Sequence, residues 1–235
     1  YEKYSTVEIM DATGGHAAAA TALGSQFTAT ADYVVKGAFG EKTASVQASA
    51  TARDVAKAFN LVAGKTGVNA SVITRARITE ATLSGDYSFT LAGKNSGSGK
   101  ESTVNVAIAN TSDVTSLKDA INAVSGATGI TASLTDDLAG VHLVQADGYN
   151  IVIGDVTGTG NLKVDGERKT DAGLIELAGA EKTLTGTTTT GDSTAIVGQV
   201  SLSSHKAYTV TPGASSNVFA TDVAVQTAAL KTMGE

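Results

Sequence analysis

A glycine-rich stretch between Gly93 and Lys100 has residue types that could bind a phosphate. It reads GKNSGSGK, whereas a phosphate-binding loop has the pattern G-x-x-x-x-G-K-[ST], with the final hydroxyl on the metal ion. Aligned on Lys100, Lys94 stands where the first glycine is needed, and Glu101 replaces the hydroxyl. The stretch therefore predicts an exposed polar loop without a nucleotide site.

Two short fragments have the residue types of a β-lactamase-like acyl transferase. Residues 65–67 read KTG and residues 203–206 read SSHK, matching the K-T-G and S-x-x-K elements. They occur here in the reverse order, and no S-D-N lies between them. The TG of the first fragment also recurs at residues 128–129 without the lysine. A repeated turn between a helix and a strand explains it better than catalysis.

The metal-binding residue types are sparse. The histidines are His16, His142 and His205; no two are four residues apart, and H-E-x-x-H is absent. The chain has 0 Cys, which excludes disulfides and cysteine-ligated zinc. The calcium-loop spacing D-x-[DN]-x-[DN]-G is also missing. We therefore expect no metal site and no cofactor.

Three aspartates could form the paired carboxylates of a glycosidase. These are Asp136, Asp137 and Asp147, and such enzymes place two carboxyl groups on either side of a glycosidic bond. The chain has 0 Trp, so it lacks the aromatic platforms on which sugars stack. Two solvated turns are the simpler explanation. We expect no catalytic residue, and the chain is predicted not to be an enzyme.

Composition limits the class of protein. The chain has 235 residues, 42% hydrophobic and 17% charged, with net charge -6, which argues against disorder. An acidic chain repels nucleic acids and anionic membrane surfaces, and no apolar run approaches the roughly 18 residues of a spanning helix. We expect neither as a partner. The first residues, YEKY, include no Met and no signal peptide, which suggests an excised segment.

An internal repeat organises the middle of the chain at an offset of 62 positions. Residues 59–71 read FNLVAGKTGVNAS and residues 121–133 read INAVSGATGITAS. An apolar stripe predicts an amphipathic helix in each copy, followed by the alternation of a strand. The stripe is Val55, Phe59 and Val62 at i, i+4 and i+7 in the first copy, and Val114, Leu117, Ile121 and Val124 in the second. Thr51 with Asp54 predicts a capping box at the first helix, and Asp113 predicts the N-cap of the second. Gly64 and Gly126 are expected to end the helices.

The repeat predicts an α+β fold with two tandem units, at about 44–92 and 105–153, each a helix on a small antiparallel sheet. Further strands are expected at Val141–Ala146 and Tyr149–Ile153. The flanks, 1–43 and 154–235, are expected to pair into a β-rich portion. Within them we expect a strand over Gln26–Lys36, a hairpin of 195–202 with 206–211, exposed loops over 154–194, and a short helix within 11–24.

The repeat resembles the internal repeat of bacterial flagellins. The resemblance rests on the two quoted segments, on DGYNIVI at 147–153 and on IVGQVSLSSHKAYTVTPG at 196–213. The first copy departs from it, with SGDYSFTL at 84–91 in place of the D-G-x-x-I strand. The resemblance implies the central, solvent-facing, variable domains of a flagellin, in the extracellular flagellar filament, where they contribute to motility, antigenicity and adhesion.

The resemblance also implies partners. Flagellin subunits assemble through long terminal helices, and no comparable helix pair is present in this sequence, so the isolated chain is expected to be a monomer. The family often carries O-linked glycans on loop Ser and Thr residues, for which Ser96, Ser98 and the run Thr187–Thr190 are candidates. The β-rich portion is expected nearest the filament core. The alternatives are the corresponding domains of a filament-cap or hook-associated protein, and an adhesin-like binding module.

Overall fold

The computed structural model describes residues 3–7, 30–48, 50–97, 99–169, 173–187, 191–213 and 226–227. Over these residues the chain is mainly β, with antiparallel strands in three sheets and three short helices. The elements in chain order are β1 (Lys3–Val7), β2 (Ala31–Gly37), β3 (Gly40–Val46), α1 (Ala52–Thr66), β4 (Val68–Ala81), β5 (Gly85–Ala92), β6 (Ser102–Ile108), α2 (Thr115–Ala123), α3 (Ser125–Thr128), β7 (Ile130–Leu134), β8 (Val141–Gln145), β9 (Ile151–Gly158), β10 (Leu162–Lys169), β11 (Ile175–Leu184), β12 (Thr194–Ile196), β13 (Gln199–Ser204), β14 (Thr209–Pro212) and β15 (Gln226–Thr227).

The expected α+β fold of two tandem helix-on-sheet units is wrong. β4 does not stop after the repeat but runs for 14 residues, because its alternation continues through the buried Thr74, Ala76 and Ile78 without a turn residue. β5, expected to complete a first unit, instead pairs with β6 and β9. The repeat offset matched β5 and β9 as equivalent strands of two separate units, but the two strands are neighbours in one sheet.

Three local expectations are also wrong. Residues 154–194 are not mainly loops, because β10 and β11 pair along most of their length there. β13 and β14 do not form a hairpin, since β13 pairs with β1 and β4 while β14 pairs with β2 and β15. α1 runs past Gly64 and ends at Gly67, whereas α2 ends at Ala123, before Gly126. Gly126 lies in α3, which ends at Gly129, and the φ angles of Gly67 and Gly129 are 76° and 71°. The helix expected within 11–24 lies outside the described residues.

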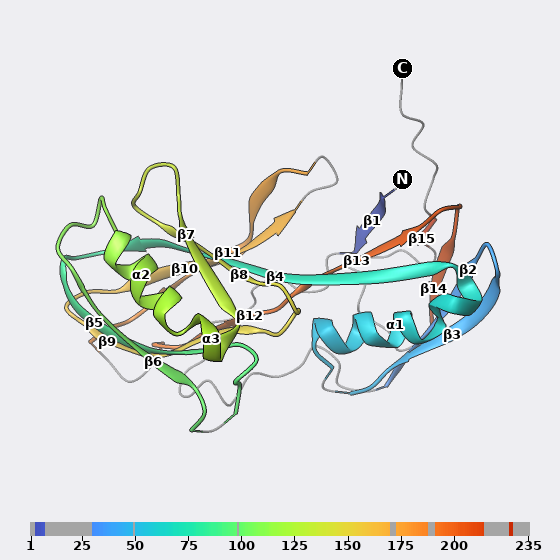
Figure 1. Ribbon diagram of the computed structural model, residues 1–235, viewed down its shortest axis with the longest axis horizontal. Helices are drawn as coiled ribbons and strands as arrows, with labels where there is room; N and C mark the ends of the chain where they lie inside the picture. Colours follow the sequence, from blue (N-terminus) through green and yellow to red (C-terminus); the bar gives the residue numbers. More distant parts are fainter. Residues whose placement is uncertain are drawn as a thin grey trace, which may run out of the picture.

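Two hydrophobic cores divide the molecule along its long axis (Figure 1). We call the first the split lobe, because its core comes from residues 31–72 and 200–210, on either side of the second. We call the second the continuous lobe, whose core lies between residues 76 and 196. β4 passes from one lobe to the other and makes the seven-stranded sheet common to both.

The two lobes share one pattern of strand pairing. In the split lobe the order of the four-stranded sheet is β15-β14-β2-β3, and in the continuous lobe it is β12-β9-β5-β6. α1 contacts β3 and β4 in the split lobe, and α2 contacts β6 and β7 in the continuous lobe. Each helix thus covers two strand edges, which would otherwise expose unpaired backbone groups.

Candidate functional site

The repeated Asn residues bind the edge of the strand that follows each helix. Asn122 Nδ2 donates to the Ala132 carbonyl oxygen at 2.9 Å, and Asn122 Oδ1 accepts from the Ala132 N–H at 2.8 Å. Asn60 makes the same pair of bonds to Ala70, both at 2.8 Å. Each side-chain amide therefore pairs with the backbone as a neighbouring strand would. It satisfies the N–H and the C=O of Ala132 or Ala70, which face away from the strand on the other side.

The repeated Thr-Gly pair forms the turn between helix and strand. Thr66 Oγ1 donates to the Val62 carbonyl oxygen at 3.1 Å and accepts from the Val68 N–H at 3.2 Å. Thr128 makes the matching bonds in the continuous lobe, both at 3.1 Å. The following glycine takes the left-handed conformation that suits a helix C-terminus. The KTG at 65–67 is thus a structural turn, and the buried Thr66 is not a catalytic hydroxyl.

The glycine-rich loop at 93–100 is closed on itself. Asn95 Oδ1 accepts from the Gly93 N–H at 3.0 Å, and Asn95 Nδ2 donates to the Lys100 carbonyl oxygen at 2.9 Å. The Lys94 N–H donates to Thr128 O at 2.9 Å. A phosphate site needs several free backbone N–H groups that point to one place. Those of Gly93 and Lys94 are already engaged, in agreement with the interpretation as a surface loop.

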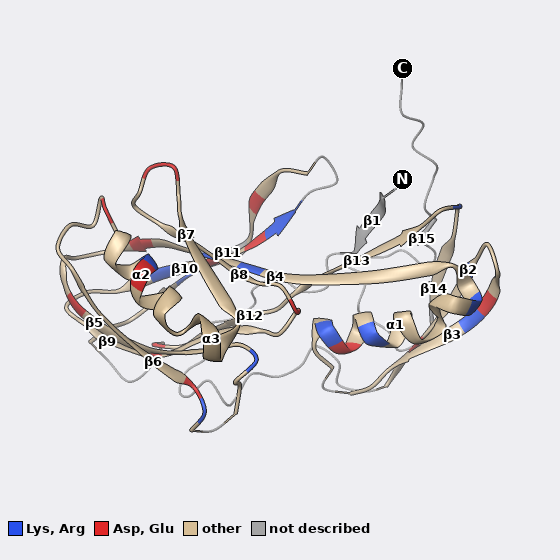
Figure 2. Ribbon diagram, viewed as in Figure 1, with Lys and Arg blue, Asp and Glu red and all other residues tan. Residues whose placement is uncertain are grey.

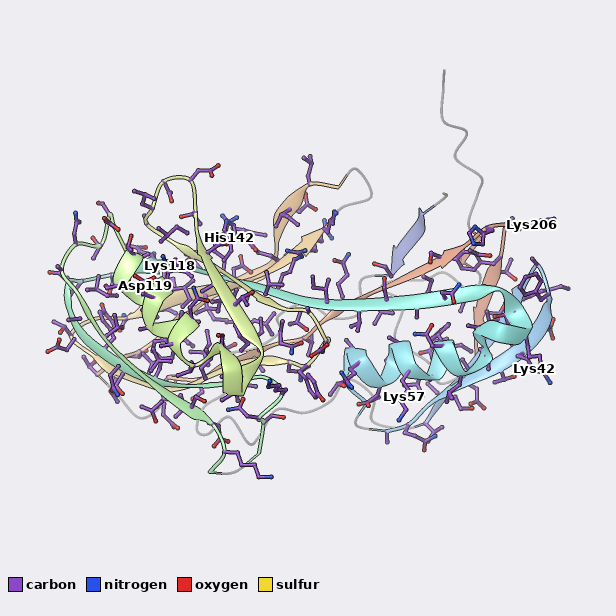
Figure 3. All side chains as sticks on the ribbon, viewed as in Figure 1. Lys42, Lys57, Lys118, Asp119, His142 and Lys206 are labelled. Carbon is purple, nitrogen blue, oxygen red and sulfur yellow. The ribbon has the colours of Figure 1, made fainter. Side chains whose placement is uncertain are left out.

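A charged cluster that the sequence patterns did not indicate lies on the large sheet of the continuous lobe. Glu167 on β10 has a side chain that is 1% exposed, and its Oε1 accepts from Arg77 Nε at 2.7 Å and contacts His142 Nδ1 at 2.8 Å. Arg77, His142 and Glu167 come from β4, β8 and β10, so their proximity depends on pairing over as many as 90 residues. His142 lies over this sheet in Figure 3.

This cluster has only part of what catalysis requires. A carboxylate on a histidine ring nitrogen orients a general base, which must then reach a nucleophile. No hydroxyl of the described residues donates a hydrogen bond to His142; the cross-strand Ser133 is its nearest candidate by register. Next to the cluster, burial raises the pKa of Asp165 above its ordinary value. The cluster is best explained as a buried ion-pair network.

The aspartates considered as an acid–base pair lie in two different turns. Asp137 accepts hydrogen bonds from Thr135 Oγ1 at 2.5 Å and from the Ala139 N–H at 3.2 Å, and these bonds lower its pKa below the ordinary value. Asp147 lies in the turn between β8 and β9. Among the described residues, no three His, Asp or Glu side chains are grouped as metal ligands. His16 lies outside the described residues.

The turn that carries Asp147 contacts the other lobe. Arg53 on α1 places its guanidinium 4.5 Å from the centre of the Tyr149 ring, and its Nη1 donates to the Asp147 carbonyl oxygen at 3.3 Å. A Cβ at Gly148 would approach the Val72 side chain to 2.4 Å. Only glycine therefore allows this close approach. The turn of the continuous lobe is seated against the helix and strand of the split lobe.

Charges of both signs are mixed along the part of the chain that the structure describes (Figure 2). Figure 2 shows Lys, Arg, Asp and Glu interspersed, with both signs close together on α1. On α2, Lys118 contacts Asp119 at 2.8 Å, and Figure 3 shows Lys42 and Lys206 at the far end of the split lobe.

A hollow of about 360 Å³ beside Phe39 and Lys206 brings together no catalytic set. No helix in the described part of the chain has both the length and the apolar character that a membrane span needs.

The family comparison matches the continuous lobe. A family model described as the flagellin hook IN motif matches residues 88–147, which extend from β5 to the Asp147 turn and include Asn122. A search of curated proteins found no match to the chain. The matched segment supports a central, variable domain of the flagellin type.

The matched motif supports a flagellin-type filament or hook protein. The flagellin family is a structural family, and it implies assembly with other flagellin subunits in the extracellular flagellar filament. The flagellin resemblance inferred from the repeat is confirmed.

Proposed function

We propose that this chain forms the outer, solvent-facing part of a flagellin and provides the surface of the filament. The observation that carries the proposal is the helix–turn–strand of the IN motif, in which Asn122 and Gly129 build a self-contained β edge. No residues in the described part form a complete catalytic set. The role is therefore one of surface, with effects on motility, antigenicity and adhesion.

The position of the chain ends supports an orientation in the filament. β1 and β15, the described strands nearest the two ends, both join sheets of the split lobe, through β13 and β14. An insertion into a helical core leaves and returns at neighbouring points, and domain termini often lie close together. We propose that the portion containing residues 1–43 and the C-terminal strands lies nearest the filament core, with the continuous lobe outermost.

Deletion tests this function directly. In the complete protein, residues 1–235 are replaced by a short Gly/Ser linker, and filaments are examined by electron microscopy. We expect filaments to form but to be thinner, with altered antibody binding. Loss of all filaments from a stably folded deletion variant would show that this portion drives assembly.

Sedimentation of the isolated chain is a cheaper test. We expect the chain to sediment as a monomer, and concentration-dependent polymerisation would contradict the proposal.

The second candidate is the corresponding domain of a filament-cap or hook-associated protein. The description of the matched motif, which names the hook, favours it. The two candidates differ in where the complete protein is located. Immunogold labelling along the whole filament supports a flagellin, and labelling confined to the filament tip or the hook junction supports the second candidate.

An adhesin with an aromatic binding platform is less well supported. Tyr33, Tyr87 and Tyr208 are buried, with at most 3% exposure, and Tyr149 lies against Arg53.

Two of the candidate acceptors for O-linked glycans, Ser96 and Thr187, are exposed. Ser98 and Thr188–Thr190 lie outside the described residues. We propose Ser96 and Thr187 as acceptors, and mass spectrometry of protein purified from its native filament tests this.

A further inference from the structure

The family model matches only the continuous lobe, but the split lobe has the same strand pairing. In the continuous lobe Ile130 pairs with Gln145 and Leu134 with Val141, which joins β7 to β8. In the split lobe Val68 pairs with Ser204 and Val72 with Val200, which joins the start of β4 to β13. The first members of these pairs differ by 62 positions, so β13 occupies the place of β8.

The rest of the split lobe follows the same correspondence. Val46 pairs with Ala31 across β2 and β3, as Ile108 pairs with Gly85 across β5 and β6. This register makes Tyr33 the counterpart of Tyr87, and both are buried. The order of elements is hairpin, helix, strand, strand in each lobe. The split lobe is thus the same fold, interrupted between β4 and β13.

The interruption is the whole continuous lobe. In the split lobe the chain leaves after Val72 and returns at Val200, two residues that are directly paired. In the continuous lobe the same connection is the short turn Thr135–Gly140, between the paired Leu134 and Val141. One fold therefore tolerates, at one position, either a six-residue turn or a complete lobe.

We infer that the Thr135–Gly140 turn is an insertion site, at which the continuous lobe accepts a folded domain as the split lobe does. Directly paired antiparallel residues have Cα atoms roughly 4.5–5.5 Å apart, so an inserted domain with adjacent termini fits. Asp136, Asp137 and Leu138 are exposed, and exposed loop tips are where insertions are tolerated.

The bonds of the turn show where to place an insertion. Most are local: the Thr135 N–H donates to Gly140 O at 3.0 Å, and the Gly140 N–H donates to Thr135 Oγ1 at 2.9 Å. One leaves the turn, since the Val114 N–H donates to Leu138 O at 3.0 Å at the start of α2. An insertion between Asp136 and Asp137 leaves Leu138 next to its own chain neighbours and close to Val114. The bonds that cross this junction are those of Thr135 with Asp137, Leu138 and Gly140.

The test inserts a small fluorescent domain with adjacent termini between Asp136 and Asp137 of the full chain. A second variant carries only about twenty Gly/Ser residues there. Loop-closure entropy grows slowly with length, so we expect the linker variant to melt less than about 10 °C below the parent. The domain variant should be soluble and fluorescent, with the circular dichroism of the parent after subtraction of the insert.

The matched control places the same two insertions between Asp147 and Gly148, in the turn that connects β8 and β9. That turn is seated on Val72 and Arg53, so insertion there should abolish cooperative melting of the continuous lobe. Equal destabilisation at both positions, or failure of the linker variant at Asp136 to fold, would overturn the inference. Either result leaves the flagellin assignment untouched, because the filament experiments test that separately.

Discussion

At the scale of single residues, the asparagine of each repeat explains why the motif has an apolar residue followed by Asn. Ile121 is buried in the core, and the next side chain, Asn122, then points along the strand edge and binds Ala132. Phe59 and Asn60 repeat the arrangement beside Ala70. One residue anchors the helix and the other pairs the strand, so neither is replaceable by a generic polar or apolar residue.

Substitution of Asn122 by Ala should destabilise the continuous lobe. It removes two hydrogen bonds and leaves the partly buried N–H and C=O of Ala132 unpaired, at a cost of about 1–3 kcal/mol. Urea denaturation of the full chain measures the loss. Asn105→Ala, at an exposed position of β6, is the control and should change the free energy of unfolding by less than about 0.5 kcal/mol. Equal effects of the two substitutions would contradict the role of Asn122.

Asp165 gives a prediction with a definite pH dependence. Its pKa is raised in the folded chain, chiefly by burial, so folding favours the protonated carboxyl. As the pH rises from the ordinary carboxyl pKa through the folded pKa, the unfolded state ionises first and stability falls. Asp165→Asn keeps an acceptor for the Gly166 N–H without the charge. We expect this variant to be more stable than the parent near pH 7.

The measurement compares urea denaturation of Asp165→Asn and the parent at about pH 7 and about pH 4, near the ordinary carboxyl range. The stability difference should be smaller at the lower pH. Asp86→Asn, at an exposed site on β5, controls for the general change in net charge. A parent that is more stable than Asp165→Asn at neutral pH would show that attraction to Arg77 outweighs burial.

At the scale of elements, the start of α1 was predictable, whereas the start of α2 and the helix ends were not. The residue at the N-cap position of α2 is Val114 and not the expected Asp113. Thr51 and Asp54 form the expected capping box, with Thr51 N donating to Asp54 Oδ2 at 2.9 Å, because this motif depends on residues three apart. The helix end was placed at Gly64, yet α1 continues to Thr66. The left-handed Gly67 and the bonds of Thr66 determine the end, and Gly64 is simply an exposed helical glycine.

The helix stripe predicts a large stability effect at one position and a small one nearby. Phe59 is 1% exposed and lies 5.7 Å from Tyr33 between ring centres, whereas Leu61 on the same helix is 78% exposed. Phe59→Ala should cost about 3–5 kcal/mol. Leu61→Ala should change stability by less than about 0.5 kcal/mol. Calorimetry of the full chain measures both, and a loss under about 1 kcal/mol for Phe59→Ala would show that the stripe was misread.

Sheet partners could not be predicted from the repeat. Periodicity placed β7 and the start of β4 correctly, because each follows a turn signal and alternates over a few residues. The pairing of β5 with β9 and of β4 with β10 joins segments far apart in sequence, which local patterns do not encode. The cluster of Glu167 with Arg77 and His142 was missed for the same reason, since it exists only after those strands pair.

At the scale of the whole molecule, several contacts join the lobes. β4 places Val72 against the split-lobe core and Ala76 in the continuous-lobe core, and Gln199 on β13 exchanges two hydrogen bonds of 3.0 Å with the backbone of Lys169 on β10. At this level Thr74 and Gln145 are fully buried, and their Oγ1 and Nε2 atoms have no hydrogen-bond partner. The contact of Arg53 with the turn at Asp147 and Tyr149 is a further link between the lobes.

Arg53 should therefore couple the stabilities of the two lobes. Its guanidinium lies 4.5 Å from the Tyr149 ring centre, an exposed cation–π contact of about 0.5–1 kcal/mol. A double-mutant cycle with Arg53→Ala and Tyr149→Ala should give a coupling energy of that size from urea denaturation. Arg53→Lys should recover only part of it, because an ammonium does not stack on a ring as a planar guanidinium does. The control cycle pairs Arg53→Ala with Tyr87→Ala, which lies in the continuous-lobe core and should show no coupling. Strictly additive effects of Arg53 and Tyr149 would mean that this contact does not couple the stabilities of the lobes.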